Sequence, residues 1–159
     1  MKNSIKKGLG FGLTSGIITT LGMIVGLNSS THSQAVVIGG VLIIAIADAM
    51  SDALGVHISE ESENHHTTKE IWESTLATFF SKFIFAITFI VPILLFSLNI
   101  AIIISVIWGL SLIMIFSYYI SKQEKETKAF SVIFEHLFIA ILVVIATNYL
   151  GKIINNIFV

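Results

Sequence analysis

The sequence predicts an all-α integral membrane protein with five transmembrane helices. Hydrophobic residues make up 55% of the chain and its mean hydropathy is +0.91, which is more apolar than an ordinary soluble domain. Polar and turn residues divide this apolar chain into segments of roughly 20 residues, the length that crosses a bilayer. These segments are approximately 8–28, 35–58, 74–97, 99–121 and 129–151 within a single transmembrane domain, 1–159.

Polar residues mark the boundaries of each segment. The first begins behind a lysine-containing N-terminus, and we expect it to be retained because it is long enough to span and lacks a clear signal-peptidase site. An acidic segment with two histidines, 59–73, separates the second from the third. The third and fourth are predicted to form a tight hairpin around 97–99. Pro92, the only proline, predicts a kink in the last turns of the third segment.

Lysine placement predicts the orientation, because short cytoplasmic loops carry the positive excess. The N-terminus and the loop after the fourth segment are therefore expected inside, and the lysine-free loops 28–34 and 97–99 outside, which leaves the C-terminus outside. The chain has no arginine and is rich in Lys, Ile and Asn, a composition that hints at a prokaryotic plasma membrane. The lysines that carry this argument are Lys2, Lys6, Lys7, Lys122, Lys125 and Lys128.

Several function classes lack their signatures. The absence of cysteine excludes disulfides, thiolate metal sites and thiol catalysis. No phosphate-binding glycine loop, nucleophile elbow or His-Glu zinc helix occurs, so we expect neither an enzyme nor a permanently bound cofactor. Nothing in the charge pattern favours nucleic-acid binding.

Small residues predict close helix packing. The first segment contains Gly12-x-x-x-Gly16 and Gly22-x-x-x-Gly26, a spacing that lets helix backbones approach each other. The second segment is also rich in glycine and alanine. We expect these two helices to pack against each other or across a dimer interface.

Asp48 and Asp52 are the leading candidates for a functional site, because a charge at bilayer depth is costly and rarely accidental. Four residues apart, they share one helical face. Their oxygens suit hard divalent ions such as Mn(II), Fe(II), Mg or Ca, and Met50 or Met23 could add a thioether. Met50 points to the opposite side of its helix and would reach the site only from a neighbouring protomer. Two close carboxylates also repel each other, so we expect them to share a proton when no metal is bound.

Two alternatives stay open for the charged residues. The aspartates could be structural and pair with Lys82 of the third segment, which would neutralise one of them but not both. Similarly, the segment 59–73 could be a solvated linker, or it could collect divalent cations at the cytoplasmic mouth. Part of it is expected to form a short interfacial helix near Trp72. Its candidate ligands are Glu60, Glu61, Glu63, His65 and His66, and a stripe from Asp48 through Ser59 to Glu63 would lead to them.

The chain resembles the vacuolar iron transporter (VIT) family. The resemblance rests on Thr14-Ser-Gly-Ile-Ile-Thr-Thr, on Ala47-Asp-Ala-Met-Ser-Asp-Ala-Leu-Gly and on the closing Ala146-Thr-Asn-Tyr-Leu-Gly. These are similar to the family's first-helix D-G-I-V-S/T-T, second-helix A-L-S-M-A-x-G-E-Y and last-helix A-x-x-Y-x-x-G motifs. The resemblance implies a homodimer that exports Fe(II), and often Mn(II), from the cytoplasm in exchange for protons, with a site between the first and second helices of both subunits.

The chain also departs from the family pattern. The family's first-helix aspartate is Ser15 here, its second-helix methionine is Asp52, and the glutamate that follows the motif glycine is Val56. Asp48 stands where the family usually has a small residue, and the long cytoplasmic domain is reduced to 59–73. Without the soft thioether of this methionine, the site relies more on hard oxygen ligands. We therefore expect Mn(II) as a substrate beside Fe(II).

The expected function is therefore proton-coupled transport of a divalent metal through Asp48 and Asp52, with Ser15 and Met50 as auxiliaries. A membrane scaffold or metal sensor whose aspartates pair with Lys82 is the alternative from another class. A carrier for another divalent cation is the third.

Overall fold

The computed structural model describes residues 3–63, 65–122 and 129–158, and all of its regular structure is helical. Within these residues, five helical spans are long and apolar enough to cross a membrane, which confirms the predicted class. The second span is divided by a π-helical turn, η1, and the third by a short break. The elements are α1 (Asn3–Thr31), α2 (Gln34–Ile43), η1 (Ile44–Asp48), α3 (Ala49–Ser62), α4 (Thr68–Thr88), α5 (Ile90–Leu95), α6 (Leu98–Ser121) and α7 (Ala129–Phe158).

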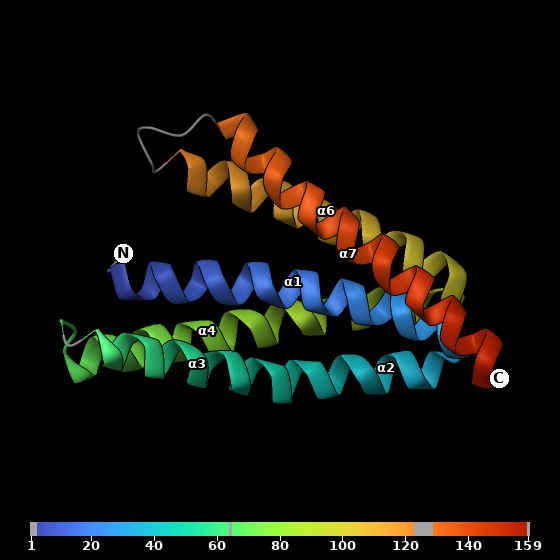
Figure 1. Ribbon diagram of the computed structural model, residues 1–159, viewed down its shortest axis with the longest axis horizontal. Helices are drawn as coiled ribbons and strands as arrows, with labels where there is room; N and C mark the ends of the chain where they lie inside the picture. Colours follow the sequence, from blue (N-terminus) through green and yellow to red (C-terminus); the bar gives the residue numbers. More distant parts are fainter. Residues whose placement is uncertain (1–2, 64, 123–128, 159) are drawn as a thin grey trace.

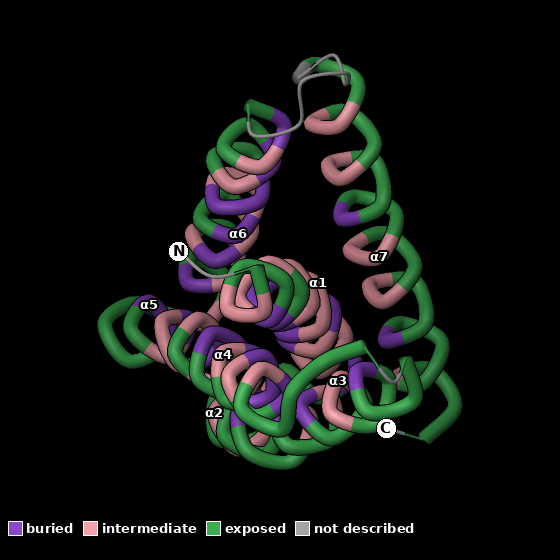
Figure 2. The backbone as a smooth tube through the Cα atoms, turned by 90° about the vertical axis from the view of Figure 1, so that its left-hand side faces the viewer, coloured by how far each residue is buried: buried purple, intermediate pink, exposed green. Residues whose placement is uncertain are grey.

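Helix α1 is the centre of the bundle (Figure 1). It packs along α4 and α7, with smaller contacts to α2, α3 and α6. Helices α6 and α7 lie on the other side of α1 from α2 and α3, and they diverge from α1 toward the end that carries the N-terminus (Figures 1 and 2). The N- and C-terminal ends lie at opposite ends of the bundle, as an odd number of spans requires.

The apolar core is built mainly on one face of α1 and on the C-terminal part of the third span. Buried residues are most frequent on α1 and α4, whereas α7 is largely exposed (Figure 2). Exposed leucine, isoleucine and phenylalanine side chains on the outer helix faces suit contact with lipid. The core includes Leu13, Ile17, Leu21, Ile24, Val37, Val41, Phe89, Ile93, Ala101, Leu112, Ile113 and Ala140.

Helix α1 contacts the second span, as expected, where Gly40 of α2 faces Leu27 and Met23, but the glycine motifs of α1 themselves face other helices. Gly12 faces Thr78 and Ser81 of α4, and a Cβ on Gly16 would lie 3.0 Å from Cγ of Lys82. The second motif faces α7 instead, where a Cβ on Gly22 would lie 2.8 Å from Cγ1 of Val143. Small residues fix how closely two helices approach but not which helix is the partner.

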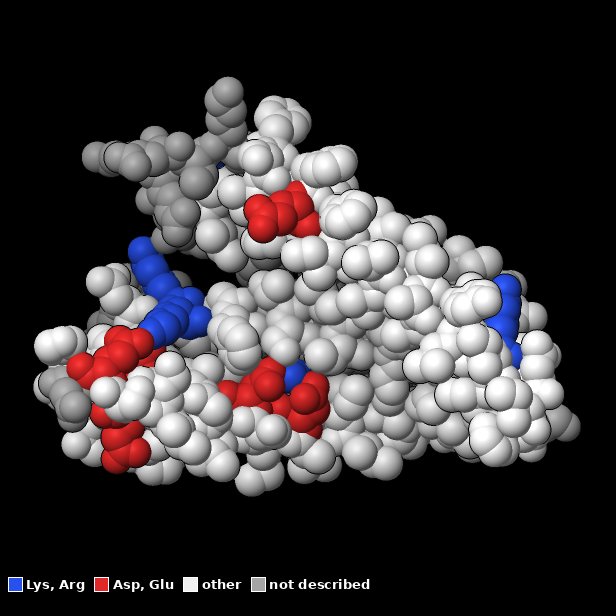
Figure 3. All heavy atoms as spheres, viewed as in Figure 1, with Lys and Arg blue, Asp and Glu red and all other residues white. Residues whose placement is uncertain are grey.

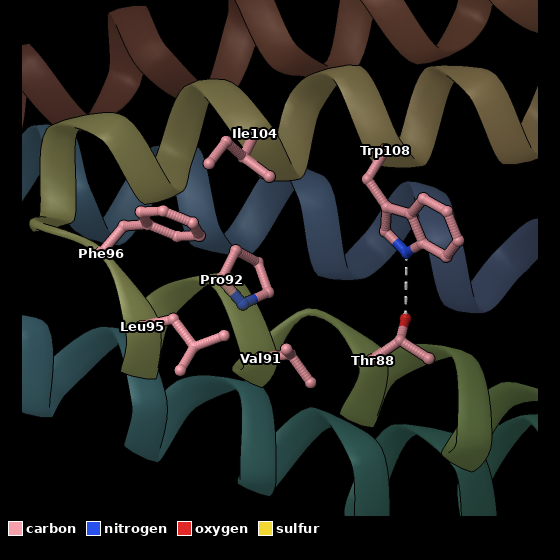
Figure 4. A pocket seen from close by; sticks show the side chains of 7 residues that line it. All are labelled: Thr88, Val91, Pro92, Leu95, Phe96, Ile104 and Trp108. Atoms are coloured by element: carbon pink, nitrogen blue, oxygen red, sulfur yellow. Dashed lines mark hydrogen bonds between the residues drawn. The ribbon is translucent and has the colours of Figure 1, made fainter.

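Pro92 interrupts the third span as predicted. Helix α4 ends at Thr88, whose carbonyl cannot accept the usual helical hydrogen bond because Pro92, four positions later, has no N–H, and α5 resumes at Ile90. The break borders a largely apolar pocket of about 310 Å³ between α4, α5 and α6 (Figure 4). At its edge Trp108 Nε1 donates a hydrogen bond to Thr88 Oγ1 at 3.2 Å.

The polar connection between the second and third spans is shorter than the sequence predicted. Helix α3 continues to Ser62 and α4 already begins at Thr68. Thr67 and Glu70 form a capping box that starts α4, so the expected separate interfacial helix is the first part of the third span. The long helices therefore carry the acidic segment directly to the bundle end.

Candidate functional site

Asp48 and Asp52 converge on one buried lysine. Lys82 Nζ lies 2.6 Å from Asp48 Oδ2 and 2.5 Å from Asp52 Oδ2, and its side chain is completely buried. Ser15 of α1 joins this cluster: Lys82 Nζ donates to Ser15 Oγ at 3.0 Å, and Ser15 Oγ donates to Asp52 Oδ2 at 2.6 Å. The cluster thus joins the first, second and third spans.

Local backbone features place these four side chains. Asp48 ends the π-helical turn Ile44–Asp48, and such turns are rare and frequently occur at functional sites. Asp52 follows one turn later in α3, so both carboxylates share one helical face, as the four-residue spacing predicted, and this face is turned toward Lys82 of α4. Gly16 allows α1 to lie directly on the stem of Lys82, which brings the neighbouring Ser15 to the ammonium.

The carboxylates are only partly covered. The side chains of Asp48 and Asp52 remain 32% and 22% exposed, whereas Lys82 behind them is inaccessible. Figure 3 shows acidic residues at mid-length on this face with part of a basic residue among them, in keeping with the position of both aspartates near the middle of the span Gln34–Ser62. In the single protomer, the exposed edges of the two carboxylates thus lie on the outer surface of the bundle and Lys82 lies on its inner side.

The charge of the cluster decides what it can bind. We expected that one lysine would neutralise one aspartate but not both, and the geometry now shows a single ammonium shared between two carboxylates. With all three groups ionised, the cluster carries one net negative charge. Such a site attracts a cation, but the cation meets a positive group already in place.

A second charged cluster lies at the end of the bundle that carries the N-terminus. Glu60 of α3 is buried, and its Oε1 lies 2.5 Å from Lys7 Nζ of α1. Lys7 also lies 3.6 Å from Glu63, and His66 Nε2 lies 3.3 Å from Glu60 and 3.2 Å from Glu63. The sequence therefore missed Lys7 as the partner of this cluster; the only signal for it is its place on the same bundle end.

Glu63 and His66 of this cluster lie between the second and third spans. The hydrogen bond with His66, and then the positive charge of Lys7, hold the pKa of Glu63 below its ordinary value of 4.5. Glu61 and His65 are exposed and contribute no contact to the Lys7 cluster. Ser59 is also exposed, so Glu60 rather than Ser59 faces the bundle.

The remaining candidate ligands lie elsewhere. Met50 is exposed and lines an apolar pocket with Leu54, Trp72 and Phe79, on a different side of α3 from the aspartates, as its spacing predicted. Met23 packs its sulfur against Gly40 of α2. Among the described residues, no three His, Asp or Glu side chains gather closely enough to hold a metal ion by themselves.

Two polar residues of α7, Glu135 and His136, lie away from the aspartate cluster. Helix α7 begins at Ala129, so Glu135 lies beyond the first turn and does not cap the helix. His136 Nδ1 forms a hydrogen bond with Ser117 Oγ at 2.8 Å and joins α7 to α6. Neither residue contacts the aspartate cluster.

Comparison with known proteins supports the resemblance seen in the sequence. Residues 9–73 match the family model of the VIT family. This stretch contains α1 from its second turn, the whole second span and the start of α4, and it includes Ser15, Asp48 and Asp52 but not Lys82. The comparison with curated proteins finds no match.

Proposed function

We propose that this integral membrane protein, whose residues 9–73 match the VIT family, is a proton-coupled exporter of divalent metal ions with Asp48 and Asp52 as its ligands. The observation that carries the proposal is the convergence of Asp48, Asp52 and Ser15, from two different spans, on one partly exposed site in mid-span. Carboxylate and hydroxyl oxygens favour hard ions, so Mn(II) stands beside Fe(II) as substrate.

Partial exposure of the aspartates supports a homodimer. In one protomer, two carboxylates at mid-span would face hydrocarbon, where a charged group costs a few kcal/mol. A second copy placed over this face would enclose the site between the first and second spans of both subunits. It would also supply further ligands, which the site needs because two carboxylates and one hydroxyl do not complete the coordination of a hard divalent ion.

Proton coupling follows from competition at the same oxygens. A divalent ion binds the ionised carboxylates, and a proton that occupies one of them must leave. The Lys7 cluster at the N-terminal end places Glu60, Glu63 and His66 where ions from the cytoplasm would first meet the protein, if that end faces the cytoplasm as the lysine distribution predicts. The acidic residues of the second span thus form two groups, one at the bundle end and one at the aspartate site, with no acidic residue between Asp52 and Glu60.

The test is flux in liposomes. Purified protein should carry Mn(II) and Fe(II) across the membrane with movement of protons in the opposite direction, and Asp52→Asn should abolish both fluxes because Asp52 accepts hydrogen bonds from Lys82 and Ser15. Glu135→Gln, which changes an exposed acid outside the site, is the matched control and should retain both fluxes. Metal flux without proton movement, or unchanged flux in Asp52→Asn, contradicts the proposal.

The buried position of Lys82 favours a second candidate function. A membrane scaffold or metal sensor would use the Asp48–Lys82–Asp52 contacts only to hold the second and third spans together. Replacement of Lys82 separates the two functions. If the protein is a scaffold, replacing Lys82 should cause a large loss of stability. If it is a transporter, the replacement should mainly change the affinity for the ion.

Competition between metals in the same liposomes addresses the remaining alternative, a carrier for another divalent cation. If Mg or Ca suppresses Mn(II) flux as effectively as Fe(II) does, the transported ion is not restricted to transition metals.

A further inference from the structure

Lys82 holds the position that a bound cation would take. Its ammonium lies between Asp48 and Asp52 and contacts both, while its side chain approaches from the protein interior and not from the exposed side. It lies outside the stretch that matches the VIT family. The ligand roles proposed for Asp48, Asp52 and Ser15 do not involve this lysine.

We propose that Lys82 is a tethered cation that sets the ion selectivity of the Asp48–Asp52 site. It fills the site when no metal is bound, and a cation enters only if it binds the two carboxylates more strongly than the tethered ammonium does. This inference rests on the proposed function, since it assigns the selectivity of that same site.

Tethering explains why alkali ions would be excluded. A covalently attached group acts at an effective concentration of millimolar or more, and here the ammonium is also held in place by Ser15 Oγ at 3.0 Å. K⁺ and Na⁺ carry the same charge as the ammonium and gain no Coulombic advantage over it. A divalent ion doubles the attraction to each carboxylate and can therefore take the ammonium's place.

The displaced ammonium stays within reach of an acceptor. Ser15 Oγ already accepts a hydrogen bond from Lys82. The backbone of Gly16 lies against the lysine stem, since a Cβ added at Gly16 would lie 3.0 Å from Cγ of Lys82. The stem is thus fixed between α1 and α4 while the terminal nitrogen exchanges partners. The ammonium can move from the carboxylates toward Ser15 without leaving its burial site.

Lys7 provides the matched control. It also contacts two acids, Glu60 and Glu63, but its side chain is 54% exposed and it lies at the bundle end rather than at the aspartates. Lys7→Met therefore removes the same charge from the protein without removing it from the proposed site.

The experiment measures binding of Mn(II) to the purified protein in detergent from the electron paramagnetic resonance of the free ion, in KCl and in choline chloride of equal ionic strength. Lys82→Met should bind Mn(II) at least about tenfold more tightly than wild type, because a positive charge beside the carboxylates is removed. Its affinity should fall in KCl relative to choline chloride, whereas wild type and Lys7→Met should bind equally in both salts.

Two results separate this inference from the proposed function. If wild type shows Mn(II) binding that Asp52→Asn removes, but Lys82→Met binds no more tightly and shows no preference between the salts, the selectivity role is wrong and the transporter stands. If neither wild type nor Lys82→Met shows Mn(II) binding that depends on Asp52, both are wrong.

A second pair of variants keeps the test valid if Lys82→Met does not fold. Asp48→Asn leaves one carboxylate beside Lys82, whereas Asp48→Asn combined with Lys82→Gln leaves one carboxylate alone and restores the net charge of the wild-type cluster. The double variant should bind Mn(II) more tightly than the single variant. Equal or weaker binding overturns the proposal.

Discussion

Substitution of Gly12 by alanine tests the close contact between α1 and α4 on which the aspartate site depends. An alanine Cβ at Gly12 would lie 2.9 Å from Cα of Thr78 and still closer to Ser81 Oγ. Ordinary carbon contacts lie at about 3.5–4.0 Å, so the helices must separate by roughly 0.5–1 Å, a gap that forfeits a quarter to a half of each dispersion contact. Overpacking of this kind costs about 1–3 kcal/mol.

Gly10→Ala is the matched control, because a Cβ at Gly10 meets nothing within 4 Å. The control should be stabilised by about 0.5–1 kcal/mol, the usual gain when alanine replaces a helical glycine. Gly12→Ala should therefore be roughly 1.5–4 kcal/mol less stable than Gly10→Ala. Equilibrium unfolding by SDS in mixed micelles, followed by helical circular dichroism, measures both. Equal stability of the two variants would show that α1 and α4 are not as close as described.

Two further predictions concern the end of the bundle that carries the N-terminus. Because His66 and Lys7 lower the pKa of Glu63, its contribution to stability is present above the ordinary value of 4.5 and is lost as pH falls through the lower folded-state pKa. Glu63→Gln should therefore lose less stability than wild type on acidification, and parallel pH profiles would contradict this. Thr67→Ala removes the cap of α4 and should cost about 1 kcal/mol, seen as faster amide exchange at Glu70. Alanine at the neighbouring Thr68, which is not the cap residue, should leave that exchange unchanged.

The sequence predicted the number and order of the spans because each is a long apolar run between polar residues. It did not predict the partners of the two glycine motifs. Both motifs allow close approach of a neighbouring helix, but Gly12 faces α4 and Gly22 faces α7. Nor did it predict that Glu135 lies beyond the first turn of α7, because nothing in the apolar pattern marked Ala129 as the start.

The aspartate pair was found from sequence because two acids in an apolar helix are conspicuous. Lys82 was recognised as a possible partner, but its simultaneous contact with both carboxylates depends on how α4 lies beside η1 and α3, which no local pattern specifies. The burial of Glu60 was missed for the same reason. Its partner Lys7 is on α1, and only the packed bundle brings the two together.

The two lysines attach one helix to its neighbours at two levels. Asp52 and Glu60 lie eight residues apart on α3, about 12 Å along the axis, and each meets an ammonium from a different helix, α4 at mid-span and α1 at the bundle end. Other side chains of α3, including Met50, Leu54 and Ile58, face outward. The position of α3 against α1 and α4 therefore responds to the ionic state of its acids, so an ion that displaces a lysine also releases a mechanical attachment between helices.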